Sequence, residues 1–285
     1  MIPYSDTSSS LAPARIVAIE TSSRIGSVAV ALGPQLLNQR RFSHSLRHAV
    51  ELMPAIRDLT RERGWKPADI EHVYVSVGPG SFTGVRIAIT AARALNQAVG
   101  CRLIAVPTVD VLALNAPAQT ENLVVILDAK RGQIYSARYR RILPGEDFSP
   151  AAAHPPVRID GWVRTAGPLL TDPEQFIRQT PRPLAMIGEG IDYHRDAIRN
   201  AAGDSAAAIG ELEQSLWPPR VENVHALGWT LAQAGRFISR EALLPIYLRK
   251  PEAEEVWEKK RDGGKEPAAM GGDLPGRYCP DPRSG

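Results

Sequence analysis

Hydrophobic positions in the first 107 residues follow two alternating patterns, which predict strands and helices in turn. Short apolar runs, typical of buried strands, occupy residues 15–19, 27–32, 36–42, 72–77 and 102–107. Between them, apolar residues recur every three or four positions over 46–59 and 85–99, which predicts two helices. The first two strands flank a polar turn, so they predict a β-hairpin.

The same hairpin pattern returns in the second half of the chain. Residues 123–128 and 133–140 predict strands, and each hairpin carries an acid near the end of its first strand, Glu20 in one and Asp128 in the other. We interpret this as one α/β unit used twice, which gives two lobes with mixed sheets and a cleft between them. Further predictions are a strand at 184–187 and helices at 109–115, 193–202 and 223–234. Residues 144–183 contain scattered proline and glycine and receive no assignment.

Composition narrows the class of protein. The 285 residues are 44% hydrophobic and 23% charged, which indicates a globular protein and excludes a disordered chain or a coiled coil. A net charge of +3 gives no basic domain of the kind that binds nucleic acid unaided. Cys101 and Cys279 suggest neither a metal site nor a disulfide framework. Without a membrane-length apolar run or a signal-peptide pattern, we expect a cytoplasmic protein with no membrane association.

A glycine-rich string between a predicted strand and a predicted helix carries the most information. It reads Gly78-Pro-Gly-Ser-Phe-Thr-Gly-Val-Arg. It is neither a Walker A loop nor a dinucleotide-binding motif, because the required spacings are missing. Two interpretations remain open: an anion or phosphate loop at a helix N-terminus, or a tight turn that seats the helix. The candidate contact residues are Gly78, Gly80, Ser81, Thr83 and Gly84, of which Ser81 and Thr83 more plausibly cap the helix than act as nucleophiles.

The longer string from Ser76 to Ile89 closely resembles the signature of the TsaB (YeaZ) family. Shorter matches follow in family order: Ile16-Val-Ala-Ile-Glu-Thr-Ser, His48 with Leu52-Met-Pro-Ala-Ile, Leu127-Asp-Ala-Lys-Arg-Gly-Gln-Ile-Tyr, Ile187-Gly-Glu-Gly and Pro245-Ile-Tyr-Leu-Arg. The resemblance covers roughly residues 14–250. It implies the two-lobed actin-like ATPase fold (ASKHA, RNase H-like), an α/β fold with mixed sheets.

The resemblance also implies a function and partners. The chain would be a non-catalytic activator of a TsaD-type subunit, which transfers a threonylcarbamoyl group to N6 of adenosine 37 in tRNAs that read ANN codons. A small TsaE-type ATPase would complete the complex, tRNA would bind through the complex, and the chain would form a homodimer when alone. This chain would require no cofactor or metal of its own, and ATP and a metal would act in the partner subunits.

Domain boundaries follow from the same resemblance and from composition. We expect a disordered arm at 1–13, an N-terminal actin-like lobe at 14–107, a second, smaller lobe at 108–250, and a mostly disordered tail at 251–285. The tail is rich in glycine, proline and charge without an apolar pattern.

The sequence departs from the family pattern at two points that bear on chemistry. The first turn begins Glu20-Thr21 where the family usually has Asp-Thr, which places nucleotide contact by Glu20, Thr21 and Asp128 in doubt. The segment from Val106 to Ala113 contains no histidine, whereas catalytic relatives carry a His-x-x-x-His metal pair there. Two alternatives stay open. One is an actin-like ATPase or kinase with its own turnover, in which Glu20 and Asp128 would hold magnesium, and the other is a glycoprotease-like hydrolase.

Each of the two long predicted helices is apolar over more than one face. In the second helix an extra arc of mostly small residues lies beside the core arc, and the first helix shows a similar excess. One interpretation is that the two helices are buried within the chain. The other is a two-helix patch that binds the catalytic subunit or a second copy. The residues of this predicted partner interface are His48, Leu52, Ala55, Leu59, Ile87, Ala91, Ala94 and Ala98.

Overall fold

The computed structural model describes residues 13–43, 47–142, 157–159 and 161–248. The predicted tail at 251–285, and all but the last residue of the predicted arm at 1–13, lie outside the described residues. Their disorder therefore stays a prediction.

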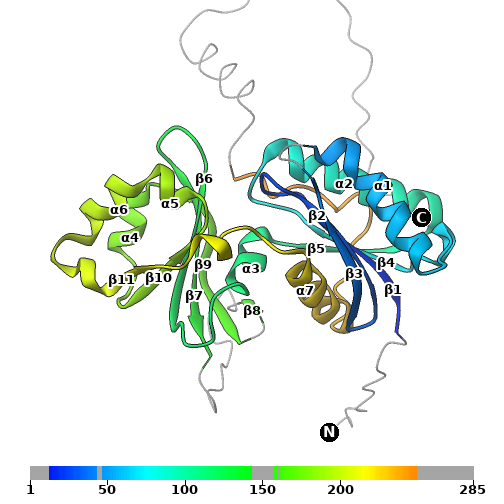
Figure 1. The fold of residues 1–285 in the computed structure, drawn as a ribbon. Helices are drawn as coiled ribbons and strands as arrows, with labels where there is room; N and C mark the ends of the chain where they lie inside the picture. The colour runs from blue at the N-terminus through cyan, green and yellow to red at the C-terminus, as the bar shows by residue number, and fades with distance from the viewer. Residues whose placement is uncertain (1–12, 44–46, 143–156, 160, 249–285) are drawn as a thin grey trace, which may run out of the picture. The chain divides into compact units, whose positions relative to one another are not determined.

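The first sheet is built around the predicted hairpin (Figure 1). Its strand order is β3-β2-β1-β4-β5, where β1 pairs with β2 and β2 with β3 antiparallel, while β1, β4 and β5 run parallel. The strands are β1 Arg15–Glu20, β2 Ser27–Leu32, β3 Gln35–Arg41, β4 His72–Ser76 and β5 Arg102–Val106. The crossover before β4 contains α1 (His48–Glu62) and a short 3-10 turn (Pro67–Asp69), and α2 (Phe82–Val99) connects β4 to β5.

Helices cover both faces of this sheet. Because strand side chains alternate, Val17 and Ile19 of β1 pack in the core beneath α1 and α2, whereas Ile16 and Ala18 point to the opposite face. Helix α7 (Val221–Gln233) covers that second face and contacts β1, β2, β4 and β5 (Figure 1). The sheet is thus buried on both sides, which explains its near-continuous apolar strands.

The second sheet repeats the plan of the first. Its order is β11-β10-β6-β7-β9-β8. On one side of β6 lie β7, β9 and β8, each antiparallel to its neighbour, and on the other side lie β10 and β11, both parallel to β6. In the first sheet β1 likewise has β2 and β3 on one side and β4 and β5 on the other. The strands are β6 Asn122–Asp128, β7 Ile134–Arg141, β8 Val157–Ile159, β9 Trp162–Thr171, β10 Leu184–Ile187 and β11 Ile209–Glu211. The predicted α/β fold with two lobes and mixed sheets is confirmed.

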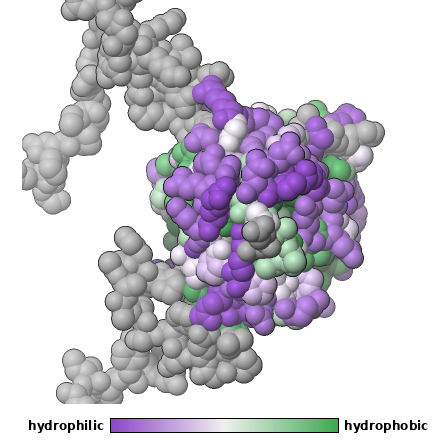
Figure 2. Space-filling model, turned by 90° about the vertical axis from the view of Figure 1, so that its left-hand side faces the viewer, coloured by the Kyte–Doolittle hydropathy of each residue, from purple (hydrophilic) through white to green (hydrophobic). Residues whose placement is uncertain are grey.

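Short helices accompany the second sheet. They are α3 Thr108–Ala113, α4 Pro173–Arg178, α5 Gly190–Tyr193 and α6 Arg195–Ala202, with 3-10 turns at Gly203–Ala208 and Gln214–Leu216. Figure 2, which looks onto the left-hand side of Figure 1, shows a mainly hydrophilic surface with smaller hydrophobic areas. Exposed ion pairs such as Arg178 with Glu174 and Arg195 with Glu211 belong to this lobe.

The assignment of residues 108–250 to one second lobe needs a correction. Helix α7 lies within that range, yet it packs on the first sheet. Gly228 permits the contact, because a Cβ there would lie 2.4 Å from the Tyr74 ring, and His225 Nε2 donates to the Gly33 carbonyl at 2.9 Å. Periodicity predicts the helix but does not indicate which sheet it covers.

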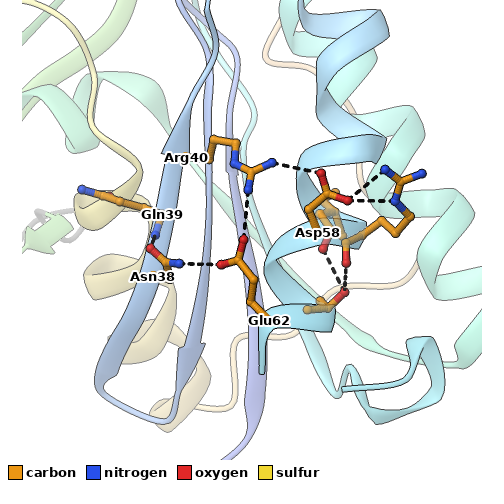
Figure 3. Close-up of polar contacts among 8 residues, drawn as sticks. Asn38, Gln39, Arg40, Asp58 and Glu62 are labelled. Carbon is orange, nitrogen blue, oxygen red and sulfur yellow. Dashed lines mark hydrogen bonds and ion pairs between the residues drawn. The ribbon is translucent and has the colours of Figure 1, made fainter. Parts of the chain in front are cut away.

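Polar contacts attach α1 to the edge of the first sheet (Figure 3). Arg40 on β3 contacts Asp58 and Glu62 on α1, each at 3.1 Å, and Asn38 Nδ2 donates to Glu62 at 2.8 Å. Exposed ion pairs each stabilise a fold only slightly, by about 0–1 kcal/mol. These ion pairs connect α1 to β3, the edge strand of the first sheet. Among the described residues no helix is long and apolar enough to cross a membrane.

Candidate functional site

The first hairpin turn sits directly on the glycine string. Ser81 N donates to the Ser22 carbonyl at 2.7 Å, and Thr21 Oγ1 donates to the Gly84 carbonyl at 2.7 Å. A Cβ at Gly80 would lie 2.4 Å from the Ser22 carbonyl oxygen, and one at Gly84 would lie 1.9 Å from that of Thr21. The glycines are therefore required by the close approach of the chain's own turn.

The start of α2 is capped within the same string. Ser81 Oγ accepts a hydrogen bond from Gly84 N at 3.2 Å, and the Ser81 carbonyl accepts one from Val85 N at 2.9 Å. The structure thus favours the tight turn that seats the helix over the phosphate loop. The Ser22 carbonyl accepts a hydrogen bond from the Ser81 amide, and the first turn fills the space beside Gly80 and Gly84. Contact of the string with an anion stays a prediction. Gly78 has a left-handed backbone, with φ +92°, and Thr83 is exposed.

Glu20 lies beneath this turn rather than in an open site. Its side chain is fully buried, and Oε1 accepts hydrogen bonds from Ser22 N and Ser22 Oγ, both at 2.6 Å. Oε2 has no hydrogen-bond partner among the described residues, although Ser76 lies beside the carboxyl at the end of the neighbouring strand. Burial raises the pKa of Glu20, against the hydrogen bonds from Ser22 that lower it. This buried and hydrogen-bonded carboxyl is suited to a structural role in the turn.

A cleft of about 670 Å³ lies where the two hairpin turns approach the glycine string. Its lining comes from the first turn (residues 22–25), the glycine string (80–82), the second turn (127–130) and, farther along, residues 189, 192–193 and 217–219. Thr108 and Trp217 contribute to its walls. Glu20 and Thr21 are not part of the lining, so of the two turn acids only Asp128 reaches the cleft.

Asp128 is held in a network of its own lobe. Its Oδ1 accepts from Lys130 N at 2.9 Å and lies 3.3 Å from His194 Nε2, and its other oxygen forms an ion pair with Lys130 Nζ. Burial raises the pKa of Asp128, but the hydrogen bonds from Lys130 and His194 outweigh it and bring the pKa below its usual range.

Glu189 is a second acid in the cleft, and sequence reasoning assigned it no role. Loss of surrounding water and the nearby Asp128 carboxylate raise the pKa of Glu189 to about 7. No group of three or more His, Cys, Asp or Glu among the described residues is arranged to hold a metal ion.

A shallower apolar groove of about 540 Å³ runs between α1 and α2. The residues that line it are Ala49, Leu52, Met53, Phe82, Thr83, Arg86, Ile87, Thr90, Ala91 and Ala94. Of the seven large hydrophobic side chains exposed in the described chain, five lie on α1, at the start of α2 or on the nearby segment 243–247: Val50, Met53, Phe82, Leu244 and Tyr247. Such a concentration is typical of an interaction site.

The predicted interface residues separate into two groups. Leu52, Ile87, Ala91 and Ala94 line the groove, and Ala98 is exposed farther along α2. His48, Ala55 and Leu59 do not line the groove and are buried in the first lobe, where Leu52 is buried as well. His48 Nε2 lies 3.0 Å from the Ser23 carbonyl, so it supports the first hairpin turn. The partner interface stays a prediction, of which Leu52, Ile87, Ala91 and Ala94 share the groove.

Several groove residues were missed because helix periodicity alone does not show how two helices are inclined to each other. Ala49 and Met53 lie on the α1 side, and Phe82 and Arg86 lie at the start of α2. The i, i+4 spacing within each pair was the only available signal.

Comparison with known proteins gives consistent results. The model of the family described as TsaD, tRNA N6-adenosine threonylcarbamoyltransferase, matches residues 43–257. The tRNA threonylcarbamoyladenosine biosynthesis protein TsaB of Bacillus subtilis (strain 168) is 27% identical over 249 residues, which cover 85% of this chain and 97% of that protein. The protein of the same name from Escherichia coli (strain K12) is 26% identical over 251 residues, covering 86% and 97%. Among solved structures, YeaZ from Pseudomonas aeruginosa superposes with a TM-score of 0.63 at 24% identity, covering 82% of this chain and all of that one.

Proposed function

Because the chain belongs to the TsaD family of tRNA N6-adenosine threonylcarbamoyltransferases and, within it, to the TsaB (YeaZ) proteins, we propose that it is the non-catalytic activator of a TsaD-type subunit. Its role is in the formation of threonylcarbamoyladenosine at adenosine 37 of tRNA. The observation that carries this function is the match of nearly full-length TsaB relatives together with the family match over residues 43–257.

The absence of catalysis by this chain alone is supported by the geometry around the glycine string. A working actin-like ATPase needs an open loop for phosphates and an accessible acid. Here the first turn packs against the loop at Gly80 and Gly84, and the Glu20 carboxyl is buried beneath Ser22. The segment 106–113 also lacks the histidine pair of catalytic relatives. We infer that ATP and a metal act in the partner subunits and that this chain needs neither.

The groove between α1 and α2 is the proposed contact surface for the TsaD-type partner. It is apolar, its wall on α2 includes the small side chains Ala91 and Ala94, and exposed Met53 lies on its α1 side. Small residues let another helix approach closely, and exposed apolar side chains supply the hydrophobic contact. The same surface would serve a homodimer when the partner is absent. A TsaE-type ATPase and tRNA would join through the assembled complex.

Reconstitution tests the function directly. The purified chain, a TsaD-type subunit, a TsaE-type ATPase, tRNA, ATP and the threonylcarbamoyl adenylate are combined, and modified nucleosides are measured by mass spectrometry. We expect product with all the proteins, little without this chain, and none with this chain as the only protein. Product from the isolated chain would contradict the non-catalytic role.

The proposed contact surface is tested with a matched pair of variants. Ala94→Arg places a long cation in the groove, whereas Ala226→Arg places one on an exposed alanine of α7, on the other face of the first sheet. Both should keep the circular dichroism spectrum and melting temperature of the original chain. Only Ala94→Arg should lose the complex on a sizing column. Normal binding by Ala94→Arg, or equal loss by both variants, would place the interface elsewhere.

A further inference from the structure

Two parts of the sequence that lie far apart meet at one end of the groove. Arg86, in the glycine string, donates from Nε to the hydroxyl of Tyr247 at 2.6 Å. The guanidinium also lies over the Phe82 ring, 3.7 Å from its centroid, and 5.5 Å from the centroid of the Tyr247 ring. The two rings are themselves 5.7 Å apart and inclined at 40°. We call these three side chains the arginine stack.

The arginine stack holds the exposed side chain of Arg86 in one position. Phe82 and Tyr247 are 50% and 44% exposed, and Arg86 is exposed as well, so solvation alone would leave all three mobile. The main chain fixes one end, since Ile246 N donates to the Val77 carbonyl at 2.9 Å, next to the glycine string. Stacking against the ring and the hydrogen bond to Nε then orient the guanidinium before any partner arrives.

The two terminal nitrogens of the Arg86 guanidinium remain available as hydrogen-bond donors. Among the described residues, no carboxylate forms an ion pair with Arg86. Of its three side-chain nitrogens only Nε donates a hydrogen bond to a described residue, Tyr247. Arg86 and Phe82 both line the apolar groove. An oriented arginine at the edge of an apolar surface, with aromatic neighbours, has the composition of a binding hot spot.

We propose that the arginine stack is the charged anchor of this groove and that Arg86 receives a carboxylate of the TsaD-type partner. The inference rests on the proposed function and adds the chemistry by which the partner is recognised. The partner's helices fill the apolar floor, and an aspartate or glutamate next to their apolar face pairs with the terminal nitrogens of Arg86. Charge pairs next to an apolar contact set partner choice and orientation, so the stack favours this partner over one without the acid.

The closing experiment measures affinity and its salt dependence by calorimetry with the purified TsaD-type subunit. Arg86→Gln removes the charge, and Arg93→Gln is the control, on the same helix but outside the groove lining. We expect Arg86→Gln to bind about ten times more weakly than the original chain and to lose much of the decline in affinity with added salt. Arg93→Gln should match the original chain in both.

A second pair of variants separates orientation from packing. Tyr247→Phe keeps the ring but removes the hydroxyl that holds Nε, so it should weaken binding less than Arg86→Gln while keeping the salt dependence. Unchanged affinity of Arg86→Gln would overturn the anchor, as would weaker binding with an unchanged salt dependence. An effect confined to self-association or to tRNA binding would also overturn it. Failure of the unaltered chain to bind the subunit would instead overturn the proposed function, and the anchor with it.

Discussion

Thr21 contacts the backbone of Gly84 both through its side-chain hydroxyl and through its own backbone carbonyl. The Thr21 hydroxyl donates to the Gly84 carbonyl at 2.7 Å, and the Thr21 carbonyl oxygen occupies the space in which a Gly84 side chain would stand. The first hairpin turn is thereby fixed to the first turn of α2. Since α2 forms one wall of the groove, this contact links the glycine string to the proposed contact surface.

Gly84→Ala should therefore be strongly destabilising. The added methyl would lie 1.9 Å from the Thr21 carbonyl oxygen, and a backbone atom has little room to move. Overpacking of this kind costs about 2–3 kcal/mol, which corresponds to a fall in melting temperature of roughly 5–10 °C for a chain of this size. Thermal unfolding followed by circular dichroism measures it.

Gly210→Ala is the matched control. Gly210 lies in β11, an added Cβ there would meet nothing within 4 Å, and its backbone is not in the left-handed region. The melting temperature of Gly210→Ala should stay within about 2 °C of that of the original chain, because substitutions at exposed positions usually change stability by less than about 0.5 kcal/mol. Equal effects of the two substitutions would show that the contact between Thr21 and Gly84 is not what requires glycine.

Much of the fold could be predicted from the sequence because its signals are local. The two hairpins and the helices at 46–59 and 85–99 follow from alternation and periodicity, and the repeated plan follows from Glu20 and Asp128 at equivalent strand ends. Strand β9 was missed, since Gly167 and Pro168 interrupt its apolar pattern within residues 144–183. The packing of α7 on the first sheet depends on contacts between distant residues, which no local pattern encodes.

The site was predictable to a smaller extent. The sequence indicates that the glycine string matters, but spacing alone left a phosphate loop and a tight turn equally open. The position of the Ser22 carbonyl, a contact between residues 59 positions apart, is what shows that the glycines seat the turn. Likewise, periodicity places Ala94 and His48 on the extra apolar arcs of their helices, yet Ala94 is exposed in the groove and His48 is buried beneath the first hairpin turn.

The raised pKa of Glu20 predicts how stability changes with pH. A folded-state pKa above the ordinary 4.5 means that the folded protein holds a proton that the unfolded chain releases. The contribution of Glu20 to stability is therefore full below about pH 4.5 and is lost as the pH rises through the raised value. Glu20→Gln keeps an oxygen for the two Ser22 donors and places an amide donor beside Ser76. It should melt above the original chain at pH 8, with the difference shrinking toward pH 5.

Melting curves over pH 5 to 8 test this expectation. Glu20→Ala is the control, because it removes the charge but also leaves the Ser22 amide and hydroxyl without their acceptor. It should be destabilised at every pH. A melting temperature of Glu20→Gln that falls in parallel with that of the original chain would show that Glu20 does not titrate in this range.

A buried ion pair joins α3 to the second sheet. Arg164 on β9 contacts both oxygens of Asp110 at 2.8 and 3.0 Å, and the Tyr139 hydroxyl donates to Asp110 at 2.7 Å. Arg164→Leu would leave a carboxylate without its cation in an environment where burial already raises the pKa of Asp110. We expect a loss of about 3–5 kcal/mol in the free energy of unfolding. Urea unfolding at pH 7.5 measures it.

The double variant Asp110→Asn with Arg164→Leu shows whether the unpaired charge is the cause. Removing both charges leaves a neutral amide that still accepts from Tyr139, so most of the lost stability should return. Because protonation relieves an unpaired carboxylate, the single Arg164→Leu variant should also be less impaired at pH 5 than at pH 8. If the single and double variants unfold alike, Arg164 stabilises the lobe by packing and not by charge.

Glu189 should titrate near neutral pH, and the contribution of the Asp128 carboxylate to this raised pKa can be tested separately. Shielding from water and the Asp128 carboxylate raise its pKa to about 7. Asp128→Asn removes that charge but keeps the backbone N–H that donates to Glu189 at 3.3 Å, so the midpoint should move toward the ordinary 4.5. Asp192→Asn is the control, since Asp192 lines the same cleft but pairs with Arg195. Carbon-13 NMR of the Glu189 carboxyl measures each midpoint. A shift with Asp192→Asn as large as that with Asp128→Asn would mean that the general charge of the cleft, and not its neighbour on β6, sets this pKa.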